Sequence, residues 1–155
     1  MNTENKVLYQ GDGSPYSTTF NDIYFDTKDG CKQSEQVFIN SNNLSKRLIN
    51  NRSEFTIAET GFGTGLNFLL TLALYQSLLQ QHSANKIANL HFISVEKYPL
   101  TKEQIQKSLL LWPRLAEQIT LLLDIYPEDP QTNQTLNFEL LNGQVKLTLL
   151  LNDAT

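Results

Sequence analysis

Glu54-Phe55-Thr56-Ile57-Ala58-Glu59-Thr60-Gly61-Phe62-Gly63-Thr64-Gly65-Leu66-Asn67 is the stretch that decides the fold. Its first five residues are largely apolar and include a β-branched pair, which predicts a buried strand. Residues 66–82 carry apolar side chains at helical spacing, which predicts a helix. Three glycines therefore lie in a strand-to-helix turn, where a ligand can approach the backbone without meeting a Cβ. Because the helix points its free N–H groups at this turn, we expect a flat, polar, partly anionic ligand there.

The spacing of the glycines differs from two common nucleotide-binding loops. A dinucleotide fingerprint requires G-x-G-x-x-G, and a Walker loop requires G-x-x-x-x-G-K-[ST]. This chain has G-x-G-x-G, no lysine in the loop, and Asn67 where Ser or Thr would stand. With Glu59 two residues before the first glycine, the pattern resembles the first motif of class I S-adenosylmethionine (SAM) methyltransferases. That resemblance implies a loop around the amino-acid end of SAM, which carries no phosphate. An ordinary glycine-rich turn is the alternative.

Composition indicates one globular domain. The 155 residues carry 16 acidic and 12 basic side chains, a formal net charge of −4, and 40% are hydrophobic. The excess of acidic over basic side chains slightly disfavours binding of nucleic acid by this part of the protein alone. The single Cys31 suits a reducing, cytoplasmic compartment, and the isolated His82 and His91 predict no metal site. Residues 1–6 lack the apolar core of a signal peptide, and no apolar run approaches the ~20 residues of a membrane helix.

Residues 1–53 are expected to form an N-terminal extension. Short strands are predicted at 21–25 and 35–39, joined by a hairpin loop at 26–30. A short helix is predicted at 44–49. The extension is expected to lie across the main domain.

Residues 54–155 are expected to form the N-terminal part of a SAM-dependent methyltransferase domain. The predicted elements are a strand at 54–59, helix at 66–82, strand at 90–95, helix to about 110 capped by Thr101, helix at about 115–124, and a hairpin of 136–141 with 144–151 around Asn142-Gly143. The fold class is therefore α/β, a Rossmann-like sheet with right-handed crossover. Because such a sheet normally continues, we expect the chain to be part of a longer protein. A small complete domain closed by its own N-terminal strands is the alternative.

Three acids follow predicted strands, where ligands of open α/β sheets bind. Glu96 is placed to accept hydrogen bonds from both ribose hydroxyls, with a solvated strand-end glutamate as the alternative. Asp153 is placed to meet the exocyclic amine of adenine, with a plain loop aspartate as the alternative. Glu59 is expected to order the loop, or to meet the methionine ammonium through water.

The remaining candidates lie in the loop and the extension. The three glycines are expected to form the cofactor-binding loop, and Phe62 and Thr64 to line the site. Asn67 is expected to cap the following helix. Asp22 and Tyr24 are substrate-side candidates that could close over the site, with simple packing as the alternative. No serine or threonine has a histidine at a spacing that suggests nucleophilic catalysis.

Several blocks together carry a narrower resemblance. They are Ser14-Pro15, Phe20-x-Asp22-x-Tyr24-Phe25, Val37-Phe38, the glycine loop, Leu90-His91-Phe92-Ile93-Ser94-Val95-Glu96-Lys97-Tyr98-Pro99-Leu100 and Trp112-Pro113. In this order they resemble the N-terminal methyltransferase domain of the bacterial bifunctional tRNA 5-methylaminomethyl-2-thiouridine biosynthesis proteins (MnmC type). The resemblance implies SAM-dependent methylation of the 5-aminomethyl group of the wobble uridine in tRNA. The implied cofactor-binding residues are Glu59, Gly61, Phe62, Gly63, Thr64, Gly65, Asn67, Glu96, Lys97 and Asp153.

The chain departs from that family in what it lacks. The family's next strand, with an acidic catalytic segment, and its FAD-dependent oxidase domain are not in these 155 residues. The catalytic residue is therefore expected beyond Thr155, and this fragment alone is expected to be inactive. Three alternatives stay open: a nucleotide-binding oxidoreductase module, a non-enzymatic module that oligomerises through its incomplete sheet, and a methyltransferase with another acceptor.

Overall fold

The computed structural model describes residues 7–49 and 53–154. The polar start at 1–6, on which the expectation of no signal peptide depends, lies outside the described residues. Within the described ranges, no helix combines the length and the apolar character that crossing a bilayer requires. The same residues contain no group of three or more His, Cys, Asp or Glu arranged to hold a metal ion.

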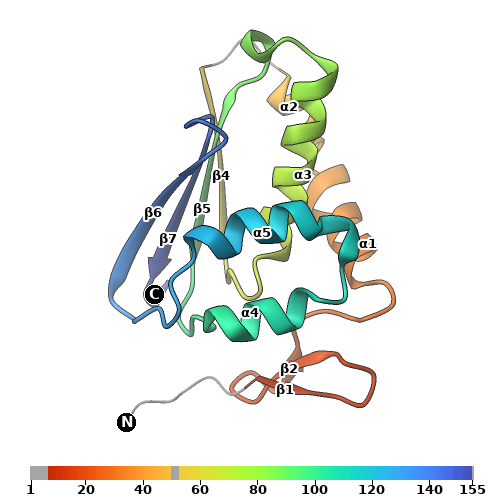
Figure 1. Cartoon of the computed structure of the whole chain (residues 1–155), viewed down its shortest axis with the longest axis vertical. Coiled ribbons are helices and arrows are strands. Elements are labelled where there is room, and N and C mark those ends of the chain that lie inside the picture. Colours follow the sequence, from red (N-terminus) through yellow and green to blue (C-terminus); the bar gives the residue numbers. More distant parts are fainter. Residues whose placement is uncertain (1–6, 50–52, 155) are drawn as a thin grey trace.

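A four-stranded sheet lies along one side of the molecule (Figure 1). Its strands are β4 (Glu54–Thr60), β5 (Asn89–Val95), β6 (Gln134–Leu140) and β7 (Val145–Leu151), in the order β4-β5-β7-β6. Strands β4, β5 and β7 run parallel, whereas β6 runs antiparallel to β7. The carboxyl ends of three neighbouring strands therefore meet at one edge of the sheet, as the α/β prediction requires.

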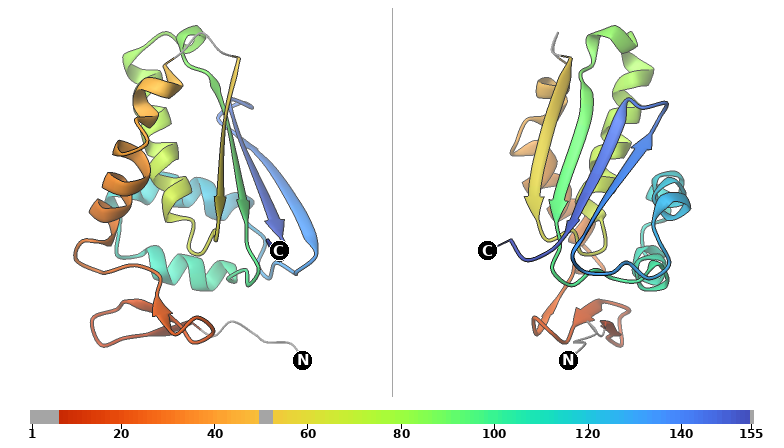
Figure 2. Two further views of the ribbon diagram at one scale, coloured as in Figure 1. Left: turned by 180° about the vertical axis from the view of Figure 1, so that it is seen from behind. Right: turned by 90° about the vertical axis from the view of Figure 1, so that its left-hand side faces the viewer.

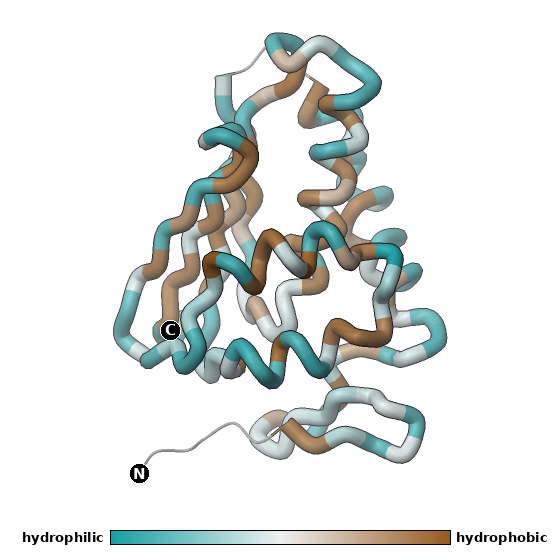
Figure 3. Tube along the Cα trace, viewed as in Figure 1, coloured by the Kyte–Doolittle hydropathy of each residue, from teal (hydrophilic) through white to brown (hydrophobic). Residues whose placement is uncertain are grey.

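The strands alternate buried and more exposed side chains because one face of the sheet packs against helices. In β4 the buried residues are Phe55 and Ile57, and the register sets them beside Leu90 and Phe92 of β5. Figure 3 shows apolar and polar residues following one another along the strands. The helices lie on one side of the sheet, and no described element covers the other face (Figure 2).

The helices lie close to their predicted positions from residue 44 onward, but the two that come before it were not predicted as helices. The helices are α1 (Gly30–Ser34), the π-helix η1 (Glu35–Asn40), α2 (Leu44–Leu48), α3 (Leu66–Gln81), α4 (Lys102–Leu109) and α5 (Ala116–Ile125), with 3-10 turns η2 (Ala84–Lys86) and η3 (Pro113–Leu115). Thr101 caps α4 as predicted, and it does so in a capping box with Gln104. The predicted cap of α3 is wrong: Gly65 is its N-cap, and Asn67 lies inside the first turn.

The predicted hairpin of 21–25 with 35–39 is also wrong. Residues 35–39 belong to the π-helix, in which Ile39 is buried and Phe38 packs on Phe92, with ring centroids 6.0 Å apart. A short apolar run does not by itself distinguish a strand from a helix, and here the core contact favours the helix.

The N-terminal antiparallel sheet instead consists of β1 (Val7–Tyr9), β2 (Pro15–Ser17) and β3 (Asp22–Ile23), in the order β1-β2-β3. It lies beyond the carboxyl ends of the parallel strands (Figures 1 and 2). The hydroxyl of Tyr9 donates to the carbonyl of Gln104 over 3.2 Å, which fixes the small sheet against α4. The extension can therefore reach the edge of the main sheet where ligands of such folds bind.

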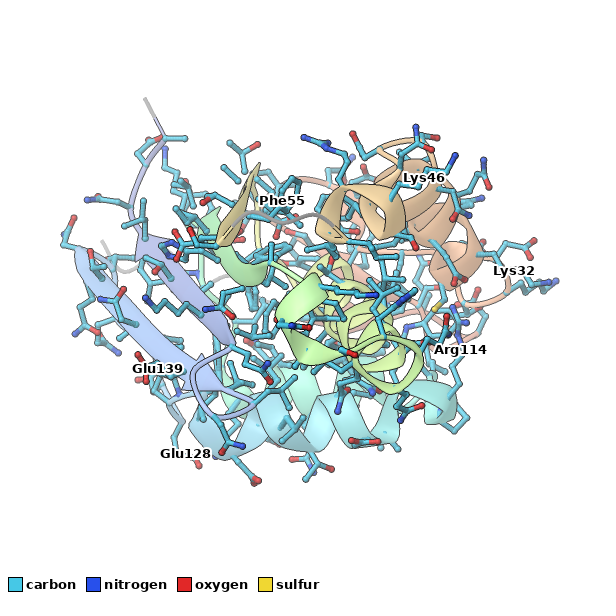
Figure 4. The ribbon with its side chains drawn as sticks, turned by 90° about the horizontal axis from the view of Figure 1, so that it is seen from above. Lys32, Lys46, Phe55, Arg114, Glu128 and Glu139 are labelled. Carbon is cyan, nitrogen blue, oxygen red and sulfur yellow. The ribbon has the colours of Figure 1, made fainter. Side chains whose placement is uncertain are left out.

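Helices α1 and η1 are fastened to the main domain by Arg114. Its Nη2 donates to Glu35 and to Cys31, each over 2.9 Å. Figure 4 shows Arg114 and Lys32 on the same side of the molecule. Buried Ile39, Leu44 and Leu48 share one core with the sheet, and the proposed boundary near residue 53 stays a prediction.

Candidate ligand-binding site at the carboxyl edge of the sheet

The glycine loop and Glu96 meet directly at this edge. The backbone N–H of Gly63 donates to Oε2 of Glu96 over 2.9 Å, and that of Tyr98 donates to Oε1 over 2.8 Å. Glu96 is only 8% exposed. Because both oxygens accept a backbone hydrogen bond, the carboxylate is held in one orientation beside the loop.

Two glycines of the loop have a backbone conformation that residues with a side chain rarely adopt. Gly63 has a φ of +54°, and a Cβ on it would come within 3.2 Å of the ring of Tyr24. Gly61 has a φ of +83°, and a Cβ there would meet nothing within 4 Å. The backbone at Gly61 thus borders open space, as a ligand-binding loop requires.

A hollow of about 280 Å³ lies between the loop and the N-terminal sheet. The residues that line it are Ser17, Phe20, Asp22, Ile23, Tyr24, Gly61, Gly63 and Glu96. The structure therefore brings the substrate-side candidates Asp22 and Tyr24 together with the loop and with Glu96.

The lining indicates which ligands the hollow can accept. Among the described residues that border it, two are acids and none is Lys or Arg. A phosphate group would meet negative charge there, whereas hydroxyls and a cationic group would find acceptors. The residues present fit the phosphate-free SAM better than a dinucleotide. The volume lies just below the ~300–1,000 Å³ usual for small-molecule pockets.

Glu59 lies beneath the loop rather than in this hollow. It accepts hydrogen bonds from Nδ2 of Asn67 over 3.1 Å and from Oγ of Ser94 over 3.0 Å. It thereby links the end of β4 with β5 and with the first turn of α3. Burial raises the pKa of Glu59 to about 7, although the two hydrogen bonds oppose this shift; the charge of Glu96 adds to it. The geometry supports the expectation that Glu59 orders the loop.

Phe62 and Thr64 do not line the hollow with their side chains, so that prediction is corrected. Phe62 is 5% exposed and stacks on Tyr126, with ring centroids 6.3 Å apart and 8° between the planes. Thr64 is buried as well. The loop turns its one large apolar side chain into the core, because burial stabilises an aromatic ring far more than a place on the rim does. Any contact of these two residues with a ligand would be made by the backbone.

Asp153 and Lys97 lie outside the hollow. They form an ion pair, and both side chains are substantially exposed. Asp153 borders a neighbouring hollow of about 470 Å³, which Thr60 and Val95 also line. These two residues directly precede Gly61 and Glu96, but the two hollows share none of their lining residues.

Three residues that line the hollow were not predicted as site residues from the sequence: Ser17, Phe20 and Ile23. Phe20 and Ile23 are exposed apolar residues in a polar stretch. An apolar side chain two residues before Asp22 was a usable signal, because large apolar residues in polar turns need a partner.

Comparison with known proteins supports the resemblance. No family model matches the chain. The chain is 42% identical, over 92% of its length, to the tRNA 5-methylaminomethyl-2-thiouridine biosynthesis bifunctional protein MnmC of Marinomonas sp. (strain MWYL1). Identity to the proteins of the same name is 43% over 92% of the chain in Legionella pneumophila (strain Corby) and 41% over 99% in Idiomarina loihiensis. The chain is homologous to the N-terminal region of the MnmC proteins.

The match covers only part of those MnmC proteins. The chain spans 20% of the Marinomonas protein, 21% of the Legionella protein and 24% of the Idiomarina protein. Among solved structures, a crystal structure of MnmC2 from Aquifex aeolicus superposes with a TM-score of 0.66 at 22% identity, covering 97% of this chain and 43% of that one. This likeness confirms the fold alone.

Proposed function

We propose that the chain binds SAM at the carboxyl edge of its sheet. We further propose that it is the SAM-binding part of an enzyme that methylates the 5-aminomethyl group of the wobble uridine in tRNA. The hydrogen bond from the Gly63 N–H to Glu96 carries the first proposal, because it joins the loop and the acid at one hollow. The name of the MnmC relatives, tRNA 5-methylaminomethyl-2-thiouridine biosynthesis proteins, supports the second.

Each residue has a proposed role. Glu96 binds the ribose hydroxyls, the backbone at Gly61 and Gly63 follows the methionine part, and Glu59 holds the loop in place. Asp153 stays the candidate for the adenine amine, because it follows β7, the neighbour of β5, and borders a hollow that the last residues of β4 and β5 also line. SAM supplies the methyl group from its sulfonium, and the chain's part is to hold the donor in position.

The proposed reaction also suggests the cellular compartment and the place of the second cofactor, FAD. Because the resemblance is to bacterial tRNA-modifying proteins, we propose a cytoplasmic setting, and the single, buried cysteine agrees with a reducing compartment. FAD, by the family resemblance, would bind elsewhere in the complete bifunctional protein.

Calorimetric titration of SAM into the chain tests the proposal. Glu96→Gln keeps the shape of the side chain but removes its charge, and charge-assisted hydrogen bonds contribute about 1.5–3 kcal/mol each. We expect at least a tenfold loss of affinity. Glu103→Gln, on the exposed side of α4, is the matched control and should bind like the wild type. Undiminished affinity in Glu96→Gln, or tighter binding of NAD than of SAM, would overturn the cofactor assignment.

A second candidate function rests on the edge strand β4. No strand pairs with its outer side among the described residues, and a hollow of about 220 Å³ runs beside it. Phe38, Leu44, Arg47 and Phe55 contribute to the lining. An interaction module would use this edge to pair with another strand. Gel filtration decides: a dimer without SAM binding favours the interaction module, and a SAM-binding monomer excludes it.

A further inference from the structure

Phe20 is an exposed aromatic residue at the mouth of the candidate SAM hollow. Its side chain is 58% exposed, and Ile23 beside it on the lining is 38% exposed. Large apolar side chains gathered on the rim of a cleft commonly mark a binding surface.

The turn that carries Phe20 holds it in one position. Phe20 lies at the tip between β2 and β3, where its N–H donates to Oγ of Ser17 over 3.2 Å. The next residue, Asn21, has a φ of +55° and its side chain accepts a hydrogen bond from the hydroxyl of Tyr16. These contacts hold the backbone at Phe20, which limits the conformational freedom that the turn loses when a ligand binds.

The ring of Phe20 is also supported from the main domain. It packs edge-on against Tyr98, with centroids 5.5 Å apart and 66° between the planes. The backbone N–H of Tyr98 in turn donates to Glu96. The exposed ring is therefore coupled by direct contacts to the acid that we assign to the ribose of SAM.

Asp22 is the acidic residue of this rim, which consists of Phe20, Asp22 and Ile23. Asp22 follows Phe20 by two residues, is exposed, and lines the same hollow. An aromatic ring offers stacking to a planar base, and a carboxylate offers a partner to a protonatable amine. A planar ring that bears an amine would use both groups together.

We propose that Phe20 is the platform on which the acceptor nucleobase stacks, with Asp22 recognising the amine that it carries. The inference rests on the proposed function and deepens it, since it assigns the recognition of the acceptor's base and of its amine to two residues on the lining of the hollow. Phe20 and Asp22 are then specificity-determining residues on the substrate side, and Glu96 belongs to the cofactor side.

The test is an NMR titration of the chain with 5-aminomethyluridine, and with uridine as the matched ligand. Stacking of a base on an aromatic ring contributes substantially to binding affinity, so Phe20→Ala should weaken 5-aminomethyluridine binding by about fivefold or more. Phe20→Trp should retain the affinity, because it keeps an aromatic ring. Asp22→Asn should weaken 5-aminomethyluridine but leave uridine unchanged. Val37→Ala, which alters a side chain 68% exposed on η1, is the control.

The outcomes separate this inference from the proposed function. If wild-type chain binds SAM but Phe20→Ala binds 5-aminomethyluridine as tightly as wild type, this inference alone is overturned. The same holds if wild type prefers uridine, or binds neither nucleoside. If wild type does not bind SAM, the proposed function fails and this inference fails with it.

Discussion

The backbone N–H of Gly63 lies 2.9 Å from Oε2 of Glu96, although 33 residues separate the two in sequence. Parallel pairing of β4 with β5 produces this contact, because it sets the loop after one strand beside the acid after the other. We therefore expect both residues to tolerate little change. Gly63 lets the backbone approach Tyr24, and Glu96 holds the loop in the conformation from which a ligand would be bound.

Gly63→Ala should lower the free energy of unfolding by about 1–2 kcal/mol. A Cβ at a positive φ is strained for an L-residue, and here it would also approach the ring of Tyr24 within 3.2 Å. Urea denaturation measures the loss. Gly11→Ala is the control, since a Cβ there would meet nothing within 4 Å and the φ is not positive. Equal stability of the two variants would contradict the account of the loop.

Glu59→Gln should change how stability depends on pH. The folded chain raises the pKa of Glu59 from 4.5 to about 7, so between these values it binds more protons than the unfolded chain. Stability of the wild type therefore falls as pH rises through this window, by something on the order of 2 kcal/mol from this residue. The glutamine variant lacks this contribution, so its stability relative to wild type should increase from pH 5 to pH 8.

Urea denaturation at pH 5 and pH 8 measures that difference. Glu54→Gln, an exposed acid at the start of the same strand, serves as the control. If both variants show the same pH dependence relative to wild type, Glu59 does not titrate as the burial requires.

Asp153→Asn should separate affinity from stability. The ion pair with Lys97 is exposed on both sides, and such pairs contribute at most about 1 kcal/mol to folding. We therefore expect an almost unchanged melting temperature but a several-fold weaker binding of SAM by calorimetry. Asp124→Asn, on the exposed side of α5, should change neither property. An affinity for SAM equal to wild type would remove Asp153 from the adenine assignment.

Much of the main domain was predictable because its sequence patterns are long or chemically specific. The strand before Gly61, the helix after Gly65 and the cap at Thr101 follow from apolar periodicity, glycine spacing and capping chemistry. Residues 35–39 were mispredicted because their apolar run is too short to show a period. Only contact with the core, through Phe38, decides their structure.

The site was predictable at its strand ends and less so away from them. Parallel strands place Glu96 beside the loop whatever the details of packing. The inward direction of Phe62 depends on its stacking against Tyr126, which sequence spacing does not encode. Asp153 follows a bend after β7, in which the N–H of Asn152 donates to the carbonyl of Leu150 over 2.9 Å, and it lines a different hollow from Glu96. Such local turns follow from tertiary packing more than from pattern.

The proposal that SAM binds at the glycine loop and Glu96 is tested most directly by titrating isotopically labelled chain with SAM while the amide chemical shifts are recorded. We expect the amide signals of Gly61, Gly63 and Tyr98 to move together and to saturate at one SAM per chain, while those of α2 stay in place. Saturable shifts confined to another part of the molecule, or no shifts at millimolar SAM, would contradict it.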